Sequence, residues 1–268
     1  MSAPTAGPAD GSPTLELRGV NKSFGAIQVL HDVNLTAYLG QVTALVGDNG
    51  AGKSTLIKAI AGIHPIDSGE FLFDGRPVSI SGPRDAAALG IEVVYQDLAL
   101  ADNLDVVQNM FLGRERHNGI LLDEVSMEQS ARDTLTRLSV RTLKSVRQPV
   151  SSLSGGQRQT VAIAKAVLWE SKVVILDEPT AALGVAQTRQ VLDLVRRLAD
   201  TGHAVIFISH NMVDVFEVAD RVAALYLGRV AADVPITEVD RTRVIELITS
   251  GRSGDLGVAP ATIAEVGV

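Results

Sequence analysis

Residues 47–55 (GDNGAGKST) restrict the fold of this chain more than any other stretch. They fit the pattern G-x-x-x-x-G-K-[S/T], between an apolar run at 42–46 and a helical pattern at 56–62. A glycine-rich turn in this context points backbone N–H groups inward, and the helix N-terminus adds positive potential. Lys53 supplies a charge for outer phosphates and Ser54 a hydroxyl for Mg²⁺. We therefore expect a phosphate-binding loop rather than a chance glycine-rich turn.

Composition narrows the class of protein. The 268 residues are 46% hydrophobic, which allows a sizeable core, and they contain no cysteine, which excludes disulfides and thiol-ligated metals. No apolar run approaches the roughly 18 residues of a membrane-spanning helix, and the first residues lack the basic and apolar regions of a signal peptide. A net charge of −7 argues against nonspecific nucleic-acid binding. We expect a soluble intracellular protein.

The order of predicted elements indicates an α/β fold. Short apolar strands alternate with helices, which implies a mostly parallel sheet covered on both faces. Residues 14–250 are expected to form a single domain, with a helical subdomain at about 97–165. A disordered tail is expected at 1–13, and a loose tail at 251–268.

Three local expectations concern secondary structure. A turn is predicted at 22–25, and two short strand-like pieces are predicted within 27–39. Residues 97–147 show helical patterns and little strand signal.

Polar side chains follow three apolar strands. Asp177 and Glu178 end the run VVILDEP, His210 follows AVIFIS, and Gln96 follows the strand at 91–95. Ligands gather at the carboxyl ends of parallel strands, so these side chains should meet the phosphate loop. Asp177 would hold Mg²⁺, Glu178 would deprotonate an attacking water, and Gln96 would ligate or sense the metal. Taken alone, His210 and Gln96 are weak signals.

A second anion site is predicted at 153–157 (LSGGQ), where small residues open a buried helix. The plainer interpretation is a serine N-cap with a flexible turn. One triphosphate hardly needs two separate helix N-termini for its terminal phosphate. The second site therefore suggests a nucleotide held by another copy of the chain.

These motifs, in this order, resemble the ATP-binding subunit of an ABC transporter over roughly residues 14–251. LSGGQ is the most specific of them. The resemblance implies a P-loop NTPase fold: a RecA-like core with an antiparallel β subdomain and a helical subdomain. It implies ATP and Mg²⁺ as cofactors and the following roles: Phe24 stacks on adenine; Gly47, Asp48, Asn49, Gly50, Ala51, Gly52, Lys53, Ser54 and Thr55 wrap the phosphates; Ser54, Gln96 and Asp177 serve Mg²⁺; Glu178, His210 and Lys53 act in catalysis; Ser154, Gly155, Gly156 and Gln157 close over ATP bound to the opposite subunit.

Further stretches, among them NMFLGRE and DEPTAALGV, resemble the ATPases of simple-sugar importers of the ribose, xylose and fructose type. Gly184 stands where most of the wider family has an aspartate, and the sugar-importer group shows the same glycine. Many members of that group are two fused copies, whereas this chain has one phosphate loop and one LSGGQ. The resemblance therefore implies a homodimer of single-copy subunits.

The implied partners are a second copy of the chain, a membrane permease and, indirectly, an extracytoplasmic sugar-binding protein, but no nucleic acid. The implied location is the cytoplasmic face of the membrane, reached through the permease. Three alternatives stay open: another cargo such as a nucleoside, an autoinducer or an amino acid; a non-transport ABC ATPase; and a module that binds ATP without hydrolysis.

Overall fold

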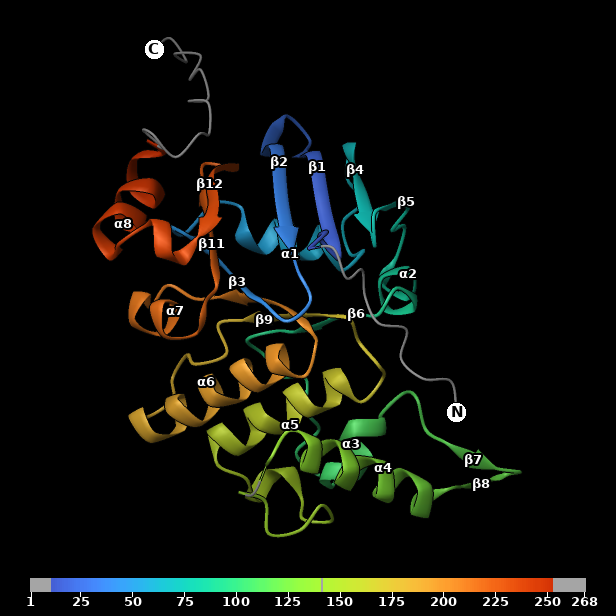
Figure 1. The fold of residues 1–268 in the computed structure, drawn as a ribbon. Coiled ribbons are helices and arrows are strands. Elements are labelled where there is room, and N and C mark those ends of the chain that lie inside the picture. Colours follow the sequence, from blue (N-terminus) through green and yellow to red (C-terminus); the bar gives the residue numbers. More distant parts are fainter. Residues whose placement is uncertain (1–10, 141, 253–268) are drawn as a thin grey trace.

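A six-stranded, mostly parallel sheet forms the centre of the computed structural model, which describes residues 11–140 and 142–252 (Figure 1). The strand order is β12-β11-β3-β10-β9-β6. Every neighbouring pair is parallel except β11 and β12, which form an antiparallel hairpin at one edge. The strands are β3 (Val42–Gly47), β6 (Ile91–Val94), β9 (Val173–Asp177), β10 (Ala204–Ile208), β11 (Arg221–Tyr226) and β12 (Arg229–Pro235). The expected α/β class is confirmed.

The central strands are mostly apolar because both faces of the sheet are covered. Successive side chains of a strand point to opposite faces. Val173 and Ile175 of β9 accordingly pack in one hydrophobic cluster with α1 (Lys53–Ile60), while Val174 and Leu176 pack in a second cluster with α5 (Gly155–Val167).

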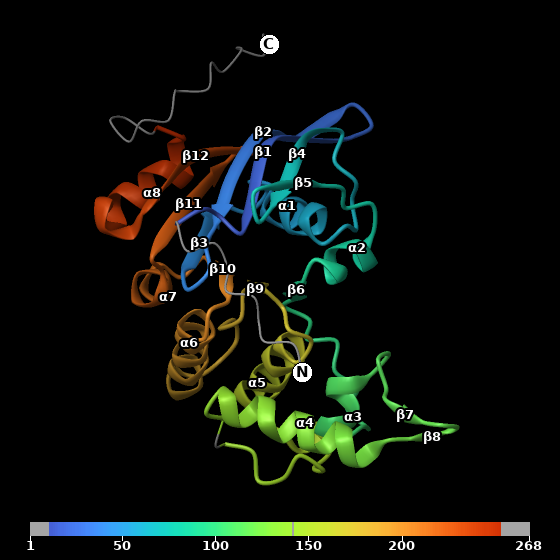
Figure 2. The same ribbon diagram turned by 45° about the vertical axis from the view of Figure 1, so that its right-hand side comes forward.

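A separate four-stranded antiparallel sheet lies on the α1 side, in the order β2-β1-β4-β5 (Figure 2). Its strands are β1 (Leu15–Phe24), β2 (Ile27–Ala37), β4 (Ser68–Phe73) and β5 (Arg76–Val78). Helix α2 (Pro83–Ala88) follows β5. Helix α1 lies between the two sheets, and its buried Leu56, Ile57 and Ile60 contribute to the cluster that joins them. This sheet corresponds to the antiparallel β subdomain implied by the resemblance.

Two local expectations for the antiparallel sheet are wrong. Residues 22–24 belong to β1, so the predicted turn at 22–25 shrinks to residues 25–26. Strand β2 runs unbroken where two pieces were expected. The β1–β2 ladder contains several register shifts. Such bulges interrupt the alternation of apolar and polar residues, so a continuous strand looks broken in the sequence.

The segment after β6 is mainly helical and lies at the far end of the molecule from the antiparallel sheet (Figures 1 and 2). It contains α3 (Val106–Phe111), α4 (Glu124–Arg137) and the short helix η1 (Val150–Ser152) before α5. A small hairpin of β7 (His117–Asn118) and β8 (Leu121–Leu122) was not expected from the sequence. Because α3, α4 and α5 share one hydrophobic cluster with the sheet, the core continues into this segment. The helical insert is present, while its limits at 97–165 and the single-domain assignment stay predictions.

The helices in the last third of the described chain pack on the face of the sheet that α5 covers. They are α6 (Val185–Asp200), α7 (Met212–Val218), η2 (Ile236–Glu238) and α8 (Arg241–Ser250). Within residues 11–140 and 142–252, no helix combines the length and apolar character needed to cross a membrane. The tails expected at 1–13 and 251–268 lie mostly outside the described residues.

Candidate functional site

The loop at 47–55 joins the end of β3 to the first turn of α1, as predicted. Gly52 is the N-cap of α1 and has a φ of 105°, a conformation that L side chains rarely adopt. Gly47 is required for space, because a Cβ there would lie 2.5 Å from the carbonyl oxygen of Leu225 on β11. Among the described residues, no side chain caps the start of α1. Its first N–H groups can therefore bind an anion.

Lys53 extends back across this loop. Its Nζ donates to the carbonyl oxygens of Gly47, at 2.6 Å, and Asp48, at 3.0 Å. Burial lowers the pKa of Lys53, while the nearby carboxylates of Glu178, Asp48 and Asp177 oppose that shift. The ammonium group thus lies at the loop, where phosphate oxygens would replace the two carbonyl contacts.

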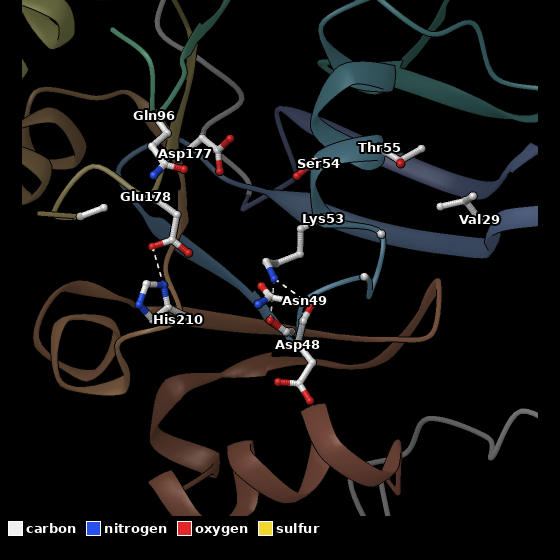
Figure 3. A pocket seen from close by; sticks show the side chains of 14 residues that line it. Val29, Asp48, Asn49, Lys53, Ser54, Thr55, Gln96, Asp177, Glu178 and His210 are labelled. Atoms are coloured by element: carbon white, nitrogen blue, oxygen red, sulfur yellow. Dashed lines mark hydrogen bonds and ion pairs between the residues drawn. The ribbon is translucent and has the colours of Figure 1, made fainter. Parts of the chain in front are cut away.

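A cavity of about 610 Å³ opens in front of the loop. This volume lies in the usual range for sites that bind small molecules. The carboxyl ends of three neighbouring strands contribute polar side chains to it, as the parallel topology predicts. The cavity is lined by Val29, Gly47, Asp48, Asn49, Gly50, Gly52, Lys53, Ser54, Thr55, Gln96, Asp177, Glu178, Ala181 and His210 (Figure 3).

Glu178 and His210 form a pair in this cavity. Oε2 of Glu178 lies 2.9 Å from Nδ1 of His210, and Figure 3 shows both side chains across the cavity from Lys53. Glu178 has a φ of 50°, an uncommon conformation for a residue with a Cβ. Its N–H donates to the carbonyl oxygen of Ile208 in β10, which ties the turn after β9 to the neighbouring strand. A carboxylate held in this way can accept a proton from a water in the cavity.

The three residues expected to serve Mg²⁺ line the same cavity. Ser54 supplies a hydroxyl oxygen, Gln96 an amide oxygen and Asp177 a carboxylate. Figure 3 shows Ser54 across the cavity from Gln96 and Asp177. Burial raises the pKa of Asp177, and the neighbouring charge of Glu178 raises it further. A cation at this point would offset that cost, and oxygen ligands are those that Mg²⁺ prefers. The donor set therefore fits the ion.

The structure refines two expectations at the edge of the site. Phe24 is 44% exposed and packs edge-on against His64 at 5.1 Å; it is not among the residues that line the cavity. Its stacking on adenine stays a prediction. Ala51 belongs to the loop, but it is buried and does not line the cavity. Val29 and Ala181 do line the cavity and were missed, because small apolar residues carry no chemical signal in a sequence.

The LSGGQ stretch forms the N-terminus of α5 and contributes no residue to the cavity lining. Ser154 caps the helix, and Gln157 completes the capping box by accepting from the Ser154 N–H at 2.9 Å. Nε2 of Gln157 also donates to the carbonyl oxygen of Thr142 at 2.6 Å. Ser154 and Gly155 are exposed. The plain N-cap interpretation is thus correct for the single chain, and the role in trans stays a prediction.

Comparison with known proteins identifies close relatives. Residues 30–181 match the model of a family described as ABC transporter. The chain is 43% identical over 247 residues to a xylose/arabinose import ATP-binding protein of Sulfolobus acidocaldarius, covering 92% of this chain and 98% of the relative. It is 47% identical over 224 residues to a fructose import ATP-binding protein of Rhizobium meliloti, covering 81% and 86%.

A solved structure supports the fold. The chain resembles a nucleotide-free ATP-binding cassette from an ABC transporter with a TM-score of 0.76. The identity is 23%, and the match covers 88% of this chain and 98% of that one. The P-loop NTPase fold is confirmed.

Proposed function

This chain belongs to the ABC transporter family of ATP-binding proteins, and on that premise we propose that it is the ATP-hydrolysing subunit of an importer for a simple sugar. The proposal that the chain hydrolyses ATP rests on one observation. Lys53, Glu178 and His210 line the same cavity beside the phosphate loop. Two of its relatives are import proteins for xylose or arabinose and for fructose, which supports the cargo class.

In the proposed mechanism, the loop at 47–55 and the N-terminus of α1 bind the phosphates of ATP. Glu178 accepts a proton from a water whose oxygen attacks the γ-phosphorus. The bond from that phosphorus to the β–γ bridging oxygen breaks, ADP leaves with the electron pair, and inorganic phosphate is released. Lys53 stabilises the charge on the phosphate oxygens.

Nδ1 of His210 lies 2.9 Å from Oε2 of Glu178, and this contact holds the direction of the carboxylate. A ring N–H of His210 can donate to a γ-phosphate oxygen. Mg²⁺ held by Ser54, Gln96 and Asp177 would neutralise part of the phosphate charge when bound.

We further propose that two copies of the chain enclose two ATP molecules. Each ATP would lie between the loop at 47–55 of one copy and Ser154–Gln157 of the other. The exposed N-terminus of α5, which contributes no residue to the chain's own cavity lining, supports this arrangement. ATP that bridges two copies favours the closed dimer over the open one, and hydrolysis removes the bridge.

The dimer would transmit this motion to a separate permease at the cytoplasmic face of the membrane. A solute-binding protein on the outer side would deliver the sugar. The net charge of −7 does not favour a nucleic-acid partner. Because an ATP-binding subunit does not contact the cargo, a nucleoside, an autoinducer or an amino acid is the main alternative.

Phosphate release by the purified protein tests the hydrolytic part. Glu178→Gln should lower kcat by about 10²- to 10⁴-fold, the usual contribution of a general base, with ATP binding retained. Glu238→Gln is the matched control, because Glu238 is an exposed glutamate on η2, well after Glu178 in the sequence. If the Glu178→Gln variant hydrolysed ATP at the wild-type rate, Glu178 would not be the general base.

Uptake by cells tests the cargo. Cells that lack the gene should lose uptake of radiolabelled ribose, xylose or fructose, and the wild-type gene, but not the Glu178→Gln gene, should restore it. If uptake of uridine or leucine were lost while sugar uptake stayed intact, the cargo would be a nucleoside or an amino acid instead of a sugar. Unchanged uptake of all of them would overturn the import role.

A further inference from the structure

Asp214 on α7 is a buried carboxylate outside the cavity lining. Only 4% of its surface is exposed, although α7 lies on the outside of the sheet. Burial of a carboxylate costs free energy unless its oxygens receive hydrogen bonds. Its partners therefore indicate what this residue does.

Each carboxylate oxygen of Asp214 binds a different turn. Oδ2 accepts from Oγ1 of Thr180 at 2.7 Å, and Oδ1 accepts from Nδ2 of Asn211 at 3.1 Å. Thr180 lies in the turn after β9, and Asn211 lies in the turn after β10. Hydrogen bonds to an ionised carboxylate are stronger than those between neutral groups. Asp214 thus links the carboxyl ends of two neighbouring parallel strands.

These two turns carry the pair that faces the phosphate loop. Glu178 precedes Thr180 by two residues, and His210 immediately precedes Asn211. The turn after β9 also contains two non-glycine residues with positive φ, Glu178 at 50° and Ala182 at 58°. Such conformations persist only where the surrounding structure holds them in place. Thr180 lies between Glu178 and Ala182 in the sequence, so its hydrogen bond to Asp214 holds this turn at its middle.

We propose that Asp214 is a positioning residue for ATP hydrolysis, which sets the separation of Glu178 and His210 through Thr180 and Asn211. This inference rests on the proposed function. It extends that function to a group that does not line the cavity. A merely structural role would require only that Asp214 stabilise the first turn of α7, where an acidic side chain is favourable. That role predicts a change in stability with normal turnover in the folded protein.

Two substitutions separate these roles. Asp214→Asn keeps the size of the side chain but places an N–H₂ group where one oxygen accepts a hydrogen bond. Thr180→Val keeps the branched shape and removes the donor to Oδ2. We expect each to lower kcat by about 10- to 100-fold, the scale of a misplacement of about 1 Å at a reacting centre. The KM for MgATP should change by less than threefold, because the phosphate loop is untouched.

Thr180→Ser, which retains the hydroxyl, should restore turnover to near the wild-type value. Asp193→Asn is the matched control: Asp193 is an exposed aspartate on α6. Rates are measured well below the lowest melting temperature of the set. In a Glu178→Gln background, Asp214→Asn should cause a smaller loss than in the wild type, since part of the effect of Asp214 acts through Glu178.

The outcomes are distinguishable. If the wild-type protein shows no hydrolysis that depends on Glu178, the proposed function fails, and the role of Asp214 fails with it. If the wild type hydrolyses ATP while folded Asp214→Asn and Thr180→Val keep their kcat, only the role of Asp214 is overturned. Equal losses in Thr180→Ser and Thr180→Val would overturn it as well. Should Asp214→Asn fail to fold, the comparison of the two Thr180 variants decides.

Discussion

Replacement of Gly47 by alanine tests whether the phosphate loop is fixed by close packing of β3 against β11. The added Cβ would lie 2.5 Å from the carbonyl oxygen of Leu225 and 3.2 Å from Cβ of Ala51. Ordinary contact begins near 3.4 Å, so the backbones must separate by about 0.9 Å. Leu225 is fully buried and pairs with Gly47 in the parallel ladder, so no flexible side chain can move aside.

Overpacking of this kind typically costs about 1–3 kcal/mol. One kcal/mol corresponds to about 2–4 °C in a chain of roughly this size, so Tm should fall by about 2–12 °C. Affinity for ATP should fall as well, because the loop begins at Gly47. Differential scanning fluorimetry measures the first effect, and titration with a fluorescent ATP analogue measures the second.

Gly184→Ala is the matched control. Gly184 has a φ of −74°, and a Cβ there would meet nothing within 4 Å. Its Tm should fall less than that of Gly47→Ala, because the change meets no close contact and only replaces glycine by the poorer N-cap alanine. A Gly47→Ala protein with wild-type Tm and wild-type ATP affinity would refute the packing argument, since it would mean that β3 and β11 separate at no cost.

Four further predictions follow from the same contacts. Lys53→Ala should abolish measurable ATP hydrolysis and weaken ATP binding, as titration would measure, whereas unchanged binding would contradict a phosphate contact for Lys53. EDTA should stop ATP hydrolysis and MgCl₂ should restore it; hydrolysis that persists in EDTA would exclude the oxygen-donor site as a metal site. Gly184→Asp should stabilise the protein by a few tenths of a kcal/mol, because Gly184 is the N-cap of α6 and aspartate is the better cap; a lower Tm would refute this. Burial lowers the pKa of His203 from its usual 6.5, so the unfolded chain binds a proton that the folded chain resists; Tm should therefore fall more steeply below about pH 6.5 in the wild type than in His203→Gln, and parallel pH profiles would refute it.

The sequence determined the features that depend on short stretches of chain. The apolar runs that became β3, β9 and β10 predict a sheet buried on both faces, because such strands have no polar face to leave in water. The loop at 47–55 is readable because its glycines, Lys53 and Ser54 act within one turn. Once the strands are parallel, their carboxyl ends lie at one edge, so Gln96, Asp177, Glu178 and His210 could be assigned to the same site in advance.

The tertiary structure decided the features that depend on contacts between distant parts of the chain. The unbroken β2 could not be recognised, because bulges disrupt the alternation that marks a strand. The places of Val29 and Phe24 relative to the cavity follow from how the antiparallel sheet packs beside the loop, and that of Ala181 follows from the turn after β9.

Asp214 shows the same limit most clearly. In the sequence it is one more acidic residue on a short helix. Its partner Thr180 lies 34 positions earlier, and they meet only because β9 and β10 are neighbours in the sheet. Local patterns therefore indicate the buried central strands, the phosphate loop and the chemistry that they carry. The order of the strands decides which side chains hold that chemistry in place.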